Sequence, residues 1–403
     1  MDNLYKFYVY TKKYGIRGSI RKTLEYINRK TKTIKRPIDI MVAVDDVIKS
    51  DYIHNPYEAP SKKNKSKLKI GWVLSPLSPG SGGQNTIVRF ARYLQESGHS
   101  ITFYIYEGIQ AQSTQEAKKI LRSSFKFDVR VKKIEAYEES DALIATGWET
   151  AYPVFNINTK AHKLYFVQDF EPYFYGLGSK YILAENTYRM NLYGITAGSW
   201  LTQKVGRYGM KADFFDFGAD LEIYRPKGEV IKKKKICFYA RPVTERRAFE
   251  VGILALDIFN KKHPDYEIEF IGWDVSEFEI PFKYVNRGVL SHDKLAELYH
   301  ESVACLVLSL TNVSLLPLEL IAAGCIPVMN DGDNNRMVLK GRDSYVDYVS
   351  CSPIELAEAL SRAVERKNIK QYALRAVKSV SSLSWDGSYK KVEKIILREV
   401  AGR

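Results

Sequence analysis

Two hydrophobic periodicities alternate along most of the chain. Short continuous apolar runs, typical of buried strands, recur from residue 68 onward. Between them lie segments in which apolar residues return at helical spacing. In residues 83–97, for example, Ile87, Phe90, Ala91 and Leu94 share one face of a helix. Alternating strands and helices predict parallel sheets that are covered by helices on both faces.

The alternation is interrupted once, at YRPKGEVIKKKK (residues 224–235), where proline, glycine and a lysine run indicate a domain junction. We therefore predict an α/β protein with two Rossmann-like, doubly wound domains, residues 68–230 and 231–385. Such domains bind ligands at the carboxyl ends of their strands, so a cleft is expected between them. A last helix is expected at residues 386–403, with a return to the first domain as one option.

Residues 1–67 differ from the rest in charge. They hold 16 Lys/Arg and 7 Asp/Glu, which is +9 of the net +14 and leaves +5 for the other 336 residues. Leu4, Phe7, Ile16, Ile20 and Leu24 recur among the basic residues at roughly helical spacing. Such a basic helix packs on the protein body or contacts an anionic membrane surface. No apolar run approaches the ~20 residues that cross a bilayer. A cytoplasmic protein is therefore expected, with peripheral contact with the plasma membrane as an option.

A glycine-rich loop, SPLSPGSGGQNT (residues 75–86), follows the first predicted strand. Gly82 and Gly83 allow the backbone to approach a ligand closely, and the start of the following helix favours anions. The loop is neither the dinucleotide fingerprint GxGxxG nor a P-loop. We expect it to contact a ligand; the alternative is an ordinary turn.

The second domain opens with FYARPVTERRAFE (residues 238–250), in which three arginines surround the start of a helix. Cations are disfavoured at a helix N-terminus, so a functional reason is expected for Arg246 and Arg247 there and for Arg241 at the strand end. Guanidinium groups that converge in this way grip a diphosphate. The alternative is surface charge that Glu245 and Glu250 neutralise.

The segment LTNVSLLPLELIAAGCIPV (residues 310–328) holds one carboxylate at the start of a short apolar helix. The backbone N–H groups of Ser314, Leu315 and Leu316 are expected to face a phosphate. Glu319 lies one turn further, where a carboxylate can accept two hydroxyl groups of a ribose. The alternative is an acid that the helix dipole favours at this position.

A fourth motif, YFVQDFEPYFYGLGS (residues 165–179), places acids and aromatic rings directly after a strand. Acids accept sugar hydroxyls and rings cover the C–H faces of a sugar, so Asp169, Glu171 and Tyr173 are candidates for binding an acceptor. The alternative is a loop whose rings simply pack. The DGD at residues 331–333 resembles a cation ligand pair but fails as an EF-hand loop, and no metal is expected.

Together the four motifs resemble the family 4 retaining glycosyltransferases of the GT-B fold, over residues 68–385. The loop YFVQDFEPYFYGLGS and the segment FYARPVTERRAFE look like those of bacterial rhamnosyltransferases that build rhamnan-type surface glycans, such as S-layer glycans. The resemblance implies a hexosyltransferase that uses dTDP-β-L-rhamnose, a saccharide or lipid-linked glycan acceptor, and neither cofactor nor metal.

The resemblance also assigns roles to single residues. Arg241 and Arg246 take the place of the Arg and Lys that hold the donor diphosphate, and Gly82 and Gly83 match the loop that approaches the donor. Glu319 matches the second Glu of the family's E-x7-E motif, which binds the ribose.

The position of the first Glu of that motif is occupied here by Thr311. In the family that carboxylate faces the donor sugar, so Thr311 and Asn312 are the candidates for this contact.

The resemblance implies transfer with retention, in which the donor phosphate assists deprotonation of the acceptor hydroxyl. Arg241 and Arg246 would stabilise the departing diphosphate, and Asp169 would orient the acceptor hydroxyl or take its proton. Three alternatives remain open: a UDP- or GDP-sugar transferase of the same fold, a GT-B-like sugar-nucleotide epimerase, and a non-enzymatic binder of a membrane surface. Nucleic acid is not an expected partner, because no nucleic-acid motif is visible.

Overall fold

The computed structural model describes residues 38–402, apart from residues 109, 227, 230, 314 and 340. By its internal contacts the chain divides into residues 1–40 and one compact unit, residues 41–403. The fold described below is that of the second unit. The basic amphipathic helix predicted around residues 4–27 lies outside the described residues.

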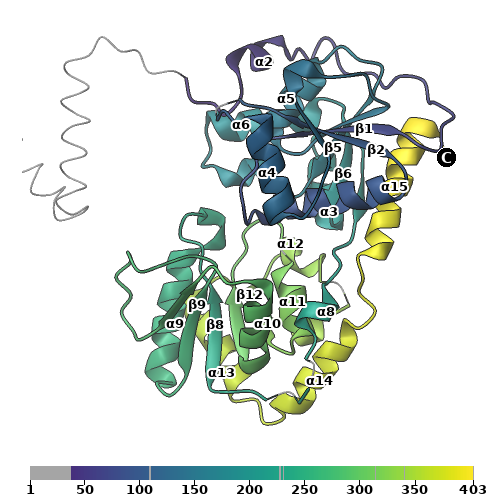
Figure 1. The fold of residues 1–403 in the computed structure, drawn as a ribbon. Helices are drawn as coiled ribbons and strands as arrows, with labels where there is room; N and C mark the ends of the chain where they lie inside the picture. Colours follow the sequence, from purple (N-terminus) through teal and green to yellow (C-terminus); the bar gives the residue numbers. More distant parts are fainter. Residues whose placement is uncertain are drawn as a thin grey trace, which may run out of the picture. The chain divides into compact units, whose positions relative to one another are not determined.

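The first domain is built on a seven-stranded parallel sheet with the strand order β3-β2-β1-β4-β5-β6-β7 (Figure 1). The chain enters at β1, adds β2 and β3 on one side, and then continues with β4 on the other side. The strand order therefore reverses between β1 and β4. The strands are β1 (Lys69–Leu74), β2 (Ser100–Ile105), β3 (Arg130–Lys133), β4 (Ala142–Ala145), β5 (His162–Val167), β6 (Tyr193–Ala197) and β7 (Ala212–Phe215). The helices are α3 (Gly82–Glu96), α4 (Thr114–Ser124), α5 (Trp148–Asn156), α6 (Ser179–Asn186) and α7 (Ser199–Gly206).

The second domain repeats this plan on a six-stranded parallel sheet with the order β10-β9-β8-β11-β12-β13, which reverses between β8 and β11. The short helix α8 (Leu221–Tyr224) precedes it in the chain. The strands are β8 (Lys235–Tyr239), β9 (Glu267–Ile271), β10 (Val285–Gly288), β11 (Ala304–Val307), β12 (Ile326–Asn330) and β13 (Asp347–Val349). The helices are α9 (Phe249–Lys262), α10 (His292–Glu301), α11 (Leu316–Ala322), α12 (Asp333–Arg336), α13 (Pro353–Val364) and α14 (Ile369–Ser379), and a last helix, α15 (Asp386–Ala401), follows this domain in the chain.

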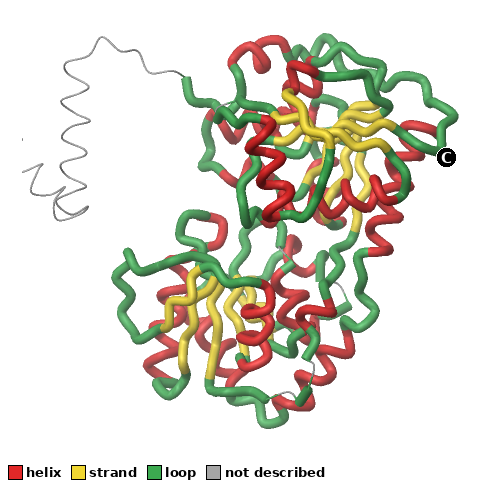
Figure 2. The backbone as a smooth tube through the Cα atoms, viewed as in Figure 1, coloured by secondary structure: helices red, strands yellow, loops and turns green. Residues whose placement is uncertain are grey.

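Helices cover both faces of each sheet, as Figure 2 shows by its colours. The apolar face that the sequence predicts for α3 is buried in the first core, and Ser81 caps this helix by accepting a hydrogen bond from the backbone N–H of Gln84. The second sheet has two cores, one under α9 and α13 and one under α10, α11 and α14. The prediction of two doubly wound domains is confirmed.

The last helix, α15, contributes Val392, Ile395, Ile396 and Val400 to the core of the first domain. It contacts α3 and β7, although it follows the second domain in the chain (Figure 1). None of the helices in the described part of the chain has the length and apolarity needed to cross a membrane.

The structure differs from the boundary predicted at residue 67. The helix α2 (Val44–Lys49) packs against α5, and Ser50 donates a hydrogen bond to Asn156 at 2.9 Å. Residues from Met41 onward therefore belong with the first domain. Their apolar members, such as Val42, are spaced too irregularly to predict this packing from the sequence.

Candidate functional site

The topology gathers the predicted motifs at the two points where strand order reverses. In open parallel sheets, the loops that follow the strands leave a crevice at such a point. The glycine-rich loop follows β1, the arginine segment follows β8, and residues 308–315 follow β11. Asp169 follows β5, one strand away from the reversal in the first sheet.

Arg241 and Arg246 lie at the carboxyl end of β8. Arg241 donates to the carbonyl of Gly272 at 3.3 Å, and its guanidinium carbon is 5.6 Å from the ring centre of Trp273. Arg246 lies in the 3₁₀ turn η4 (Glu245–Arg247), which separates β8 from α9. Its guanidinium carbon is 3.9 Å from the ring centre of Phe174, which comes from the first domain. Both residues follow β8, which flanks the point where the order of the second sheet reverses.

Arg247 has a different position from its neighbour. It is buried and donates a hydrogen bond to the hydroxyl of Ser309 at 2.5 Å, and burial lowers the pKa of its guanidinium. This geometry fixes η4 against the loop after β11. It gives Arg247 a positioning role, in place of the predicted contact with the donor.

The carboxylate of Asp169 links the two domains. It accepts hydrogen bonds from the Thr311 hydroxyl at 3.0 Å and from the backbone N–H of Asn312 at 2.9 Å. The Nε atom of Arg246 lies 3.5 Å from its Oδ2. The side-chain amide of Asn312 donates to the carbonyls of Gln168 and Ala197, at 2.9 and 3.0 Å.

Thr311 and Asn312 are both buried in this junction. Thr311, which occupies the position of the family's first Glu, thus contacts the carboxylate of Asp169 from the first domain. Because Asp169 already holds these partners, its side chain is less available to an acceptor than the sequence suggests.

Glu319 lies on α11, inside a polar group formed with Tyr224, Asp220 and Arg89. Burial raises the pKa of Glu319 to about 7, with a smaller contribution from the charge of Asp220, whereas a hydrogen bond from Tyr224 and the charge of Arg89 act in the opposite direction. Arg89 binds Asp220 through two hydrogen bonds, at 2.9 and 2.7 Å. The carboxyl group is therefore close to its titration midpoint at neutral pH.

The residues whose backbone N–H groups are predicted to contact a phosphate lie at the start of α11. The helix has seven residues, Leu316–Ala322, and Leu315 packs against the core of the first domain. Leu316 is buried, and Ser314 lies outside the described residues. The contact of these backbone groups with a phosphate stays a prediction.

Of the two other acceptor candidates, Glu171 points into the core. It is buried and accepts hydrogen bonds from the backbone N–H of Trp148 at 2.5 Å and the Tyr165 hydroxyl at 3.0 Å. Burial raises the pKa of Glu171 well above its usual value, and its hydrogen bonds to Trp148 and Tyr165 turn the carboxyl group toward the core. Tyr173 is partly exposed and accepts a hydrogen bond from Lys204 at 2.8 Å.

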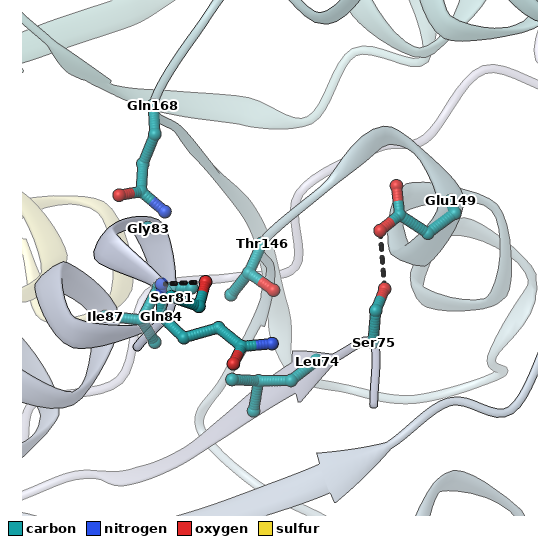
Figure 3. Close-up of a pocket in the computed structure, with 9 residues that line it drawn as sticks. All are labelled: Leu74, Ser75, Ser81, Gly83, Gln84, Ile87, Thr146, Glu149 and Gln168. Carbon is teal, nitrogen blue, oxygen red and sulfur yellow. Dashed lines mark hydrogen bonds between the residues drawn. The ribbon is translucent and has the colours of Figure 1, made fainter. Parts of the chain in front are cut away.

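The glycine-rich loop borders a polar pocket in the first domain (Figure 3). A Cβ atom on Gly83 would lie 3.5 Å from the side-chain amide of Gln168, whereas one on Gly82 would meet open space. The sequence interpretation missed Glu149 and Gln168, which also line this pocket. Each follows a strand of the first sheet, β4 or β5, and that position is the only signal that could have indicated them.

The DGD segment is held by an ion pair in which Arg336 binds Asp331, at 2.5 and 2.9 Å. Within the described residues no group of three or more His, Cys, Asp or Glu side chains is arranged to hold a metal ion.

Models of two domains of one protein family match the chain. The model of the WsaF N-terminal domain matches residues 93–197, and that of the WsaF C-terminal domain matches residues 234–361. A curated relative, the O-antigen biosynthesis protein RfbC of Myxococcus xanthus, is 29% identical over 353 residues. This match covers 81% of the present chain but 27% of RfbC, so the chain spans about a quarter of that protein's length.

Solved structures of glycosyltransferases share the fold. Sucrose-phosphate synthase from Thermosynechococcus elongatus aligns with a TM-score of 0.61 and 12% identity, over 84% of this chain and all of that one. WaaG, a glycosyltransferase involved in lipopolysaccharide biosynthesis, aligns with a TM-score of 0.55 and 14% identity, over 81% of this chain and 99% of that one. The chain thus has a GT-B fold, and two of its segments match the models of the WsaF N-terminal and C-terminal domains in that order.

Proposed function

We propose that this chain is a glycosyltransferase that moves a sugar from a nucleotide-sugar donor to a glycan acceptor in the synthesis of a cell-surface polysaccharide. The proposal draws on the match to both WsaF domains, on the O-antigen biosynthesis relative and on the lipopolysaccharide glycosyltransferase of the same fold.

One observation of the structure carries the proposal furthest. Two arginines, Arg241 and Arg246, follow the strand β8, and a carboxylate, Glu319, lies on the helix that follows β11. These two strands flank the reversal of the second sheet, where open α/β sheets bind nucleotides. Guanidinium groups suit a diphosphate and a carboxylate suits two ribose hydroxyls, so the pair fits a nucleoside diphosphate.

In the proposed reaction, the bond between the anomeric carbon and the diphosphate oxygen breaks while the acceptor oxygen bonds to the same face of that carbon. The acceptor's hydroxyl proton passes to the departing diphosphate. Because the new bond forms on the face that the diphosphate leaves, the anomeric configuration is retained. Arg241 and Arg246 stabilise the charge that develops on the diphosphate, which is the main electrostatic contribution expected of the protein. Asp169 then acts mainly by holding Arg246 and the Thr311–Asn312 segment in place.

For the donor we propose dTDP-β-L-rhamnose, on the resemblance of the loops 165–179 and 238–250 to those of rhamnosyltransferases. Thermal unfolding with added dTDP, UDP or GDP tests this, because a ligand that binds the folded state raises Tm. The proposal expects dTDP to raise Tm most. A larger shift in Tm with UDP or GDP would indicate a UDP- or GDP-sugar as the donor. No shift with any of the three nucleotides would contradict the proposed function.

The sugar-nucleotide epimerase is the second enzyme class on this fold. An epimerase converts the donor without an acceptor, so an assay of the donor alone separates the two. No specific contact in the structure favours it.

A further inference from the structure

We infer that the pocket at the carboxyl ends of β1, β4 and β5 is an acceptor subsite for one neutral sugar residue, with Glu149 and Gln168 as its recognition groups. The inference rests on the proposed function and extends it, because it names residues and a substrate class for the acceptor. It also replaces Asp169 and Glu171 as the predicted acceptor contacts, because both carboxyl groups are hydrogen-bonded to other protein groups.

The pocket is small and polar. Its volume is about 160 Å³, below the ~300 Å³ at which pockets for drug-sized ligands begin, so it suits a single sugar ring. Ser75, Gln84, Thr146, Glu149 and Gln168 supply its polar groups, and Leu74 and Ile87 supply apolar surface (Figure 3). A mixed lining of this kind matches a ring with hydroxyl groups and C–H faces.

Some of these polar groups are already committed to the protein. The Gln84 amide bonds to the backbone of Ser78 at 2.9 Å and of Pro76 at 3.0 Å, which shapes the loop. The Thr146 hydroxyl donates to the carbonyl of Val73 at 2.7 Å. These residues build the wall of the pocket and leave recognition to others.

Glu149 and Gln168 have hydrogen-bonding capacity left. One carboxylate oxygen of Glu149 accepts from the Ser75 hydroxyl at 2.5 Å, and no protein donor within the described residues binds the other. The side-chain amide of Gln168 has no partner among the described residues. A carboxylate oxygen accepts a hydroxyl and an amide both donates and accepts, so together they can bind neighbouring sugar hydroxyls.

The simplest structural explanation for Glu149 is a charge that favours the start of α5. Other residues already bind the backbone N–H groups at the start of α5. The Thr150 hydroxyl accepts from the backbone N–H groups of Thr146 and Gly147, at 2.9 and 3.0 Å, and Glu171 accepts from that of Trp148. Glu149 instead turns toward Ser75 and the pocket (Figure 3).

Two features indicate a neutral acceptor next to the donor site. A negative carboxylate at the pocket repels an anionic sugar such as a uronate, and a phosphate likewise. Gln168 also adjoins Asp169, and its backbone carbonyl accepts from Asn312 of the second domain. A sugar in the pocket therefore lies beside the junction that Thr311 and Asn312 form.

The test measures binding of methyl α-L-rhamnopyranoside and of methyl β-D-glucuronide by NMR, in the full chain saturated with dTDP. We expect the neutral glycoside to bind better than the acidic one. Glu149→Gln should weaken binding of the neutral glycoside about tenfold, through the loss of a hydrogen bond to a charged group, and Gln168→Ala about two- to tenfold, through the loss of hydrogen bonds between neutral groups. Both variants should bind dTDP as the natural chain does, and so should the control Glu96→Gln, which changes an exposed residue at the end of α3.

Each outcome decides one proposal. Normal glycoside binding by both variants, tighter binding of the glucuronide, or no glycoside binding by the natural chain overturns the subsite. Loss of all nucleoside diphosphate binding by the natural chain contradicts the proposed function instead. If Glu149→Gln fails to fold, Gln168→Ala still decides, because removal of an amide without protein partners leaves no protein group unpaired.

Discussion

Replacing Thr311 by glutamate tests the junction between the two domains most sharply. The variant introduces the carboxylate that the family 4 glycosyltransferases, which this chain resembles, have at this position. In this chain, however, the Thr311 hydroxyl lies 3.0 Å from Oδ2 of Asp169, and Thr311 is fully buried. A glutamate would place a second negative charge against the first, so we expect the family's own residue to be destabilising here.

The expected size follows from three contributions. Two unit charges roughly 4 Å apart repel by about 4 kcal/mol at an effective dielectric constant of ~20, and Arg246, 3.5 Å from the same oxygen, offsets part of this. The lost hydrogen bond to a charged group costs about 1.5–3 kcal/mol. The larger side chain adds about 1–3 kcal/mol of strain. Together these contributions come to roughly 6–10 kcal/mol before the offset by Arg246, so a decrease of at least about 3 kcal/mol in the free energy of unfolding is predicted.

Urea unfolding, followed by circular dichroism, would compare the natural chain with Thr311→Glu, Asp169→Thr and the double variant. The double variant again has one carboxylate at the junction, so it should be more stable than Thr311→Glu, with a coupling energy of at least about 2 kcal/mol. The destabilisation by Thr311→Glu should also shrink as the pH falls, because protonation of one carboxyl removes the repulsion. Thr114→Glu, at the start of α4, is the control and should change stability by less than ~0.5 kcal/mol.

The reasoning would be refuted if Thr311→Glu lost less than about 1 kcal/mol, or if it lost the same amount with and without Asp169. Either result would mean that Asp169 and Thr311 do not interact in solution.

Three further predictions follow from the site. Arg246→Ala should weaken dTDP binding by about tenfold or more in calorimetry, because a hydrogen bond from a charged group contributes about 1.5–3 kcal/mol. The control Arg122→Ala, which breaks an exposed ion pair with Asp128, should leave dTDP binding unchanged. Equal affinity of the two variants for dTDP would mean that Arg246 does not bind the donor. Burial raises the pKa of Glu319 to about 7, and the carboxyl group must be ionised to accept hydrogen bonds from both ribose hydroxyls. Donor affinity should therefore rise between about pH 6 and pH 8 with release of a proton, and Glu319→Gln should abolish this rise. A donor affinity of the natural chain that does not change with pH would contradict the assignment of Glu319 to the ribose. The pKa of Glu171 is raised above its unfolded value of about 4.3, so its ionisation opposes folding only as the pH rises above that value. Glu171→Gln should therefore gain stability relative to the natural chain from pH 5 to pH 8 in urea unfolding, and a relative loss over that range would show that Glu171 is ionised in the fold.

Much of the fold could be predicted because the buried strands are continuous apolar runs. The apolar runs KIGWVLS (residues 69–75) and ACLVLSL (residues 304–310) form β1 and β11, and the topology brings the loops after them to the reversal points of the sheets. The edge strands β3 and β13 cannot be recognised in this way. Their sequences, RVKK and DYV, are short and partly charged, because an edge strand needs little apolar surface.

The site could be predicted only where a local motif marks it. Asp169 and Thr311 are 142 positions apart, so nothing in the sequence indicates that they form a hydrogen bond. Glu171 follows Asp169 by two residues, yet it faces the core, because the turn η2 (Glu171–Phe174) redirects the chain. Glu149 stands alone after β4 without a motif, and only the fold shows that it lines one pocket with Ser75, which follows β1, and Gln168, which follows β5.

The most direct test of the central claim is a transfer assay with dTDP-β-L-rhamnose and a rhamnose-terminated glycan acceptor. The account predicts an acceptor that is heavier by one deoxyhexose in mass spectrometry, a new linkage that retains the donor's anomeric configuration in NMR, and little product from the variant Arg241→Ala/Arg246→Ala. Binding of the nucleotide without transfer from this donor, or from UDP- and GDP-sugars tested in the same way, would contradict it.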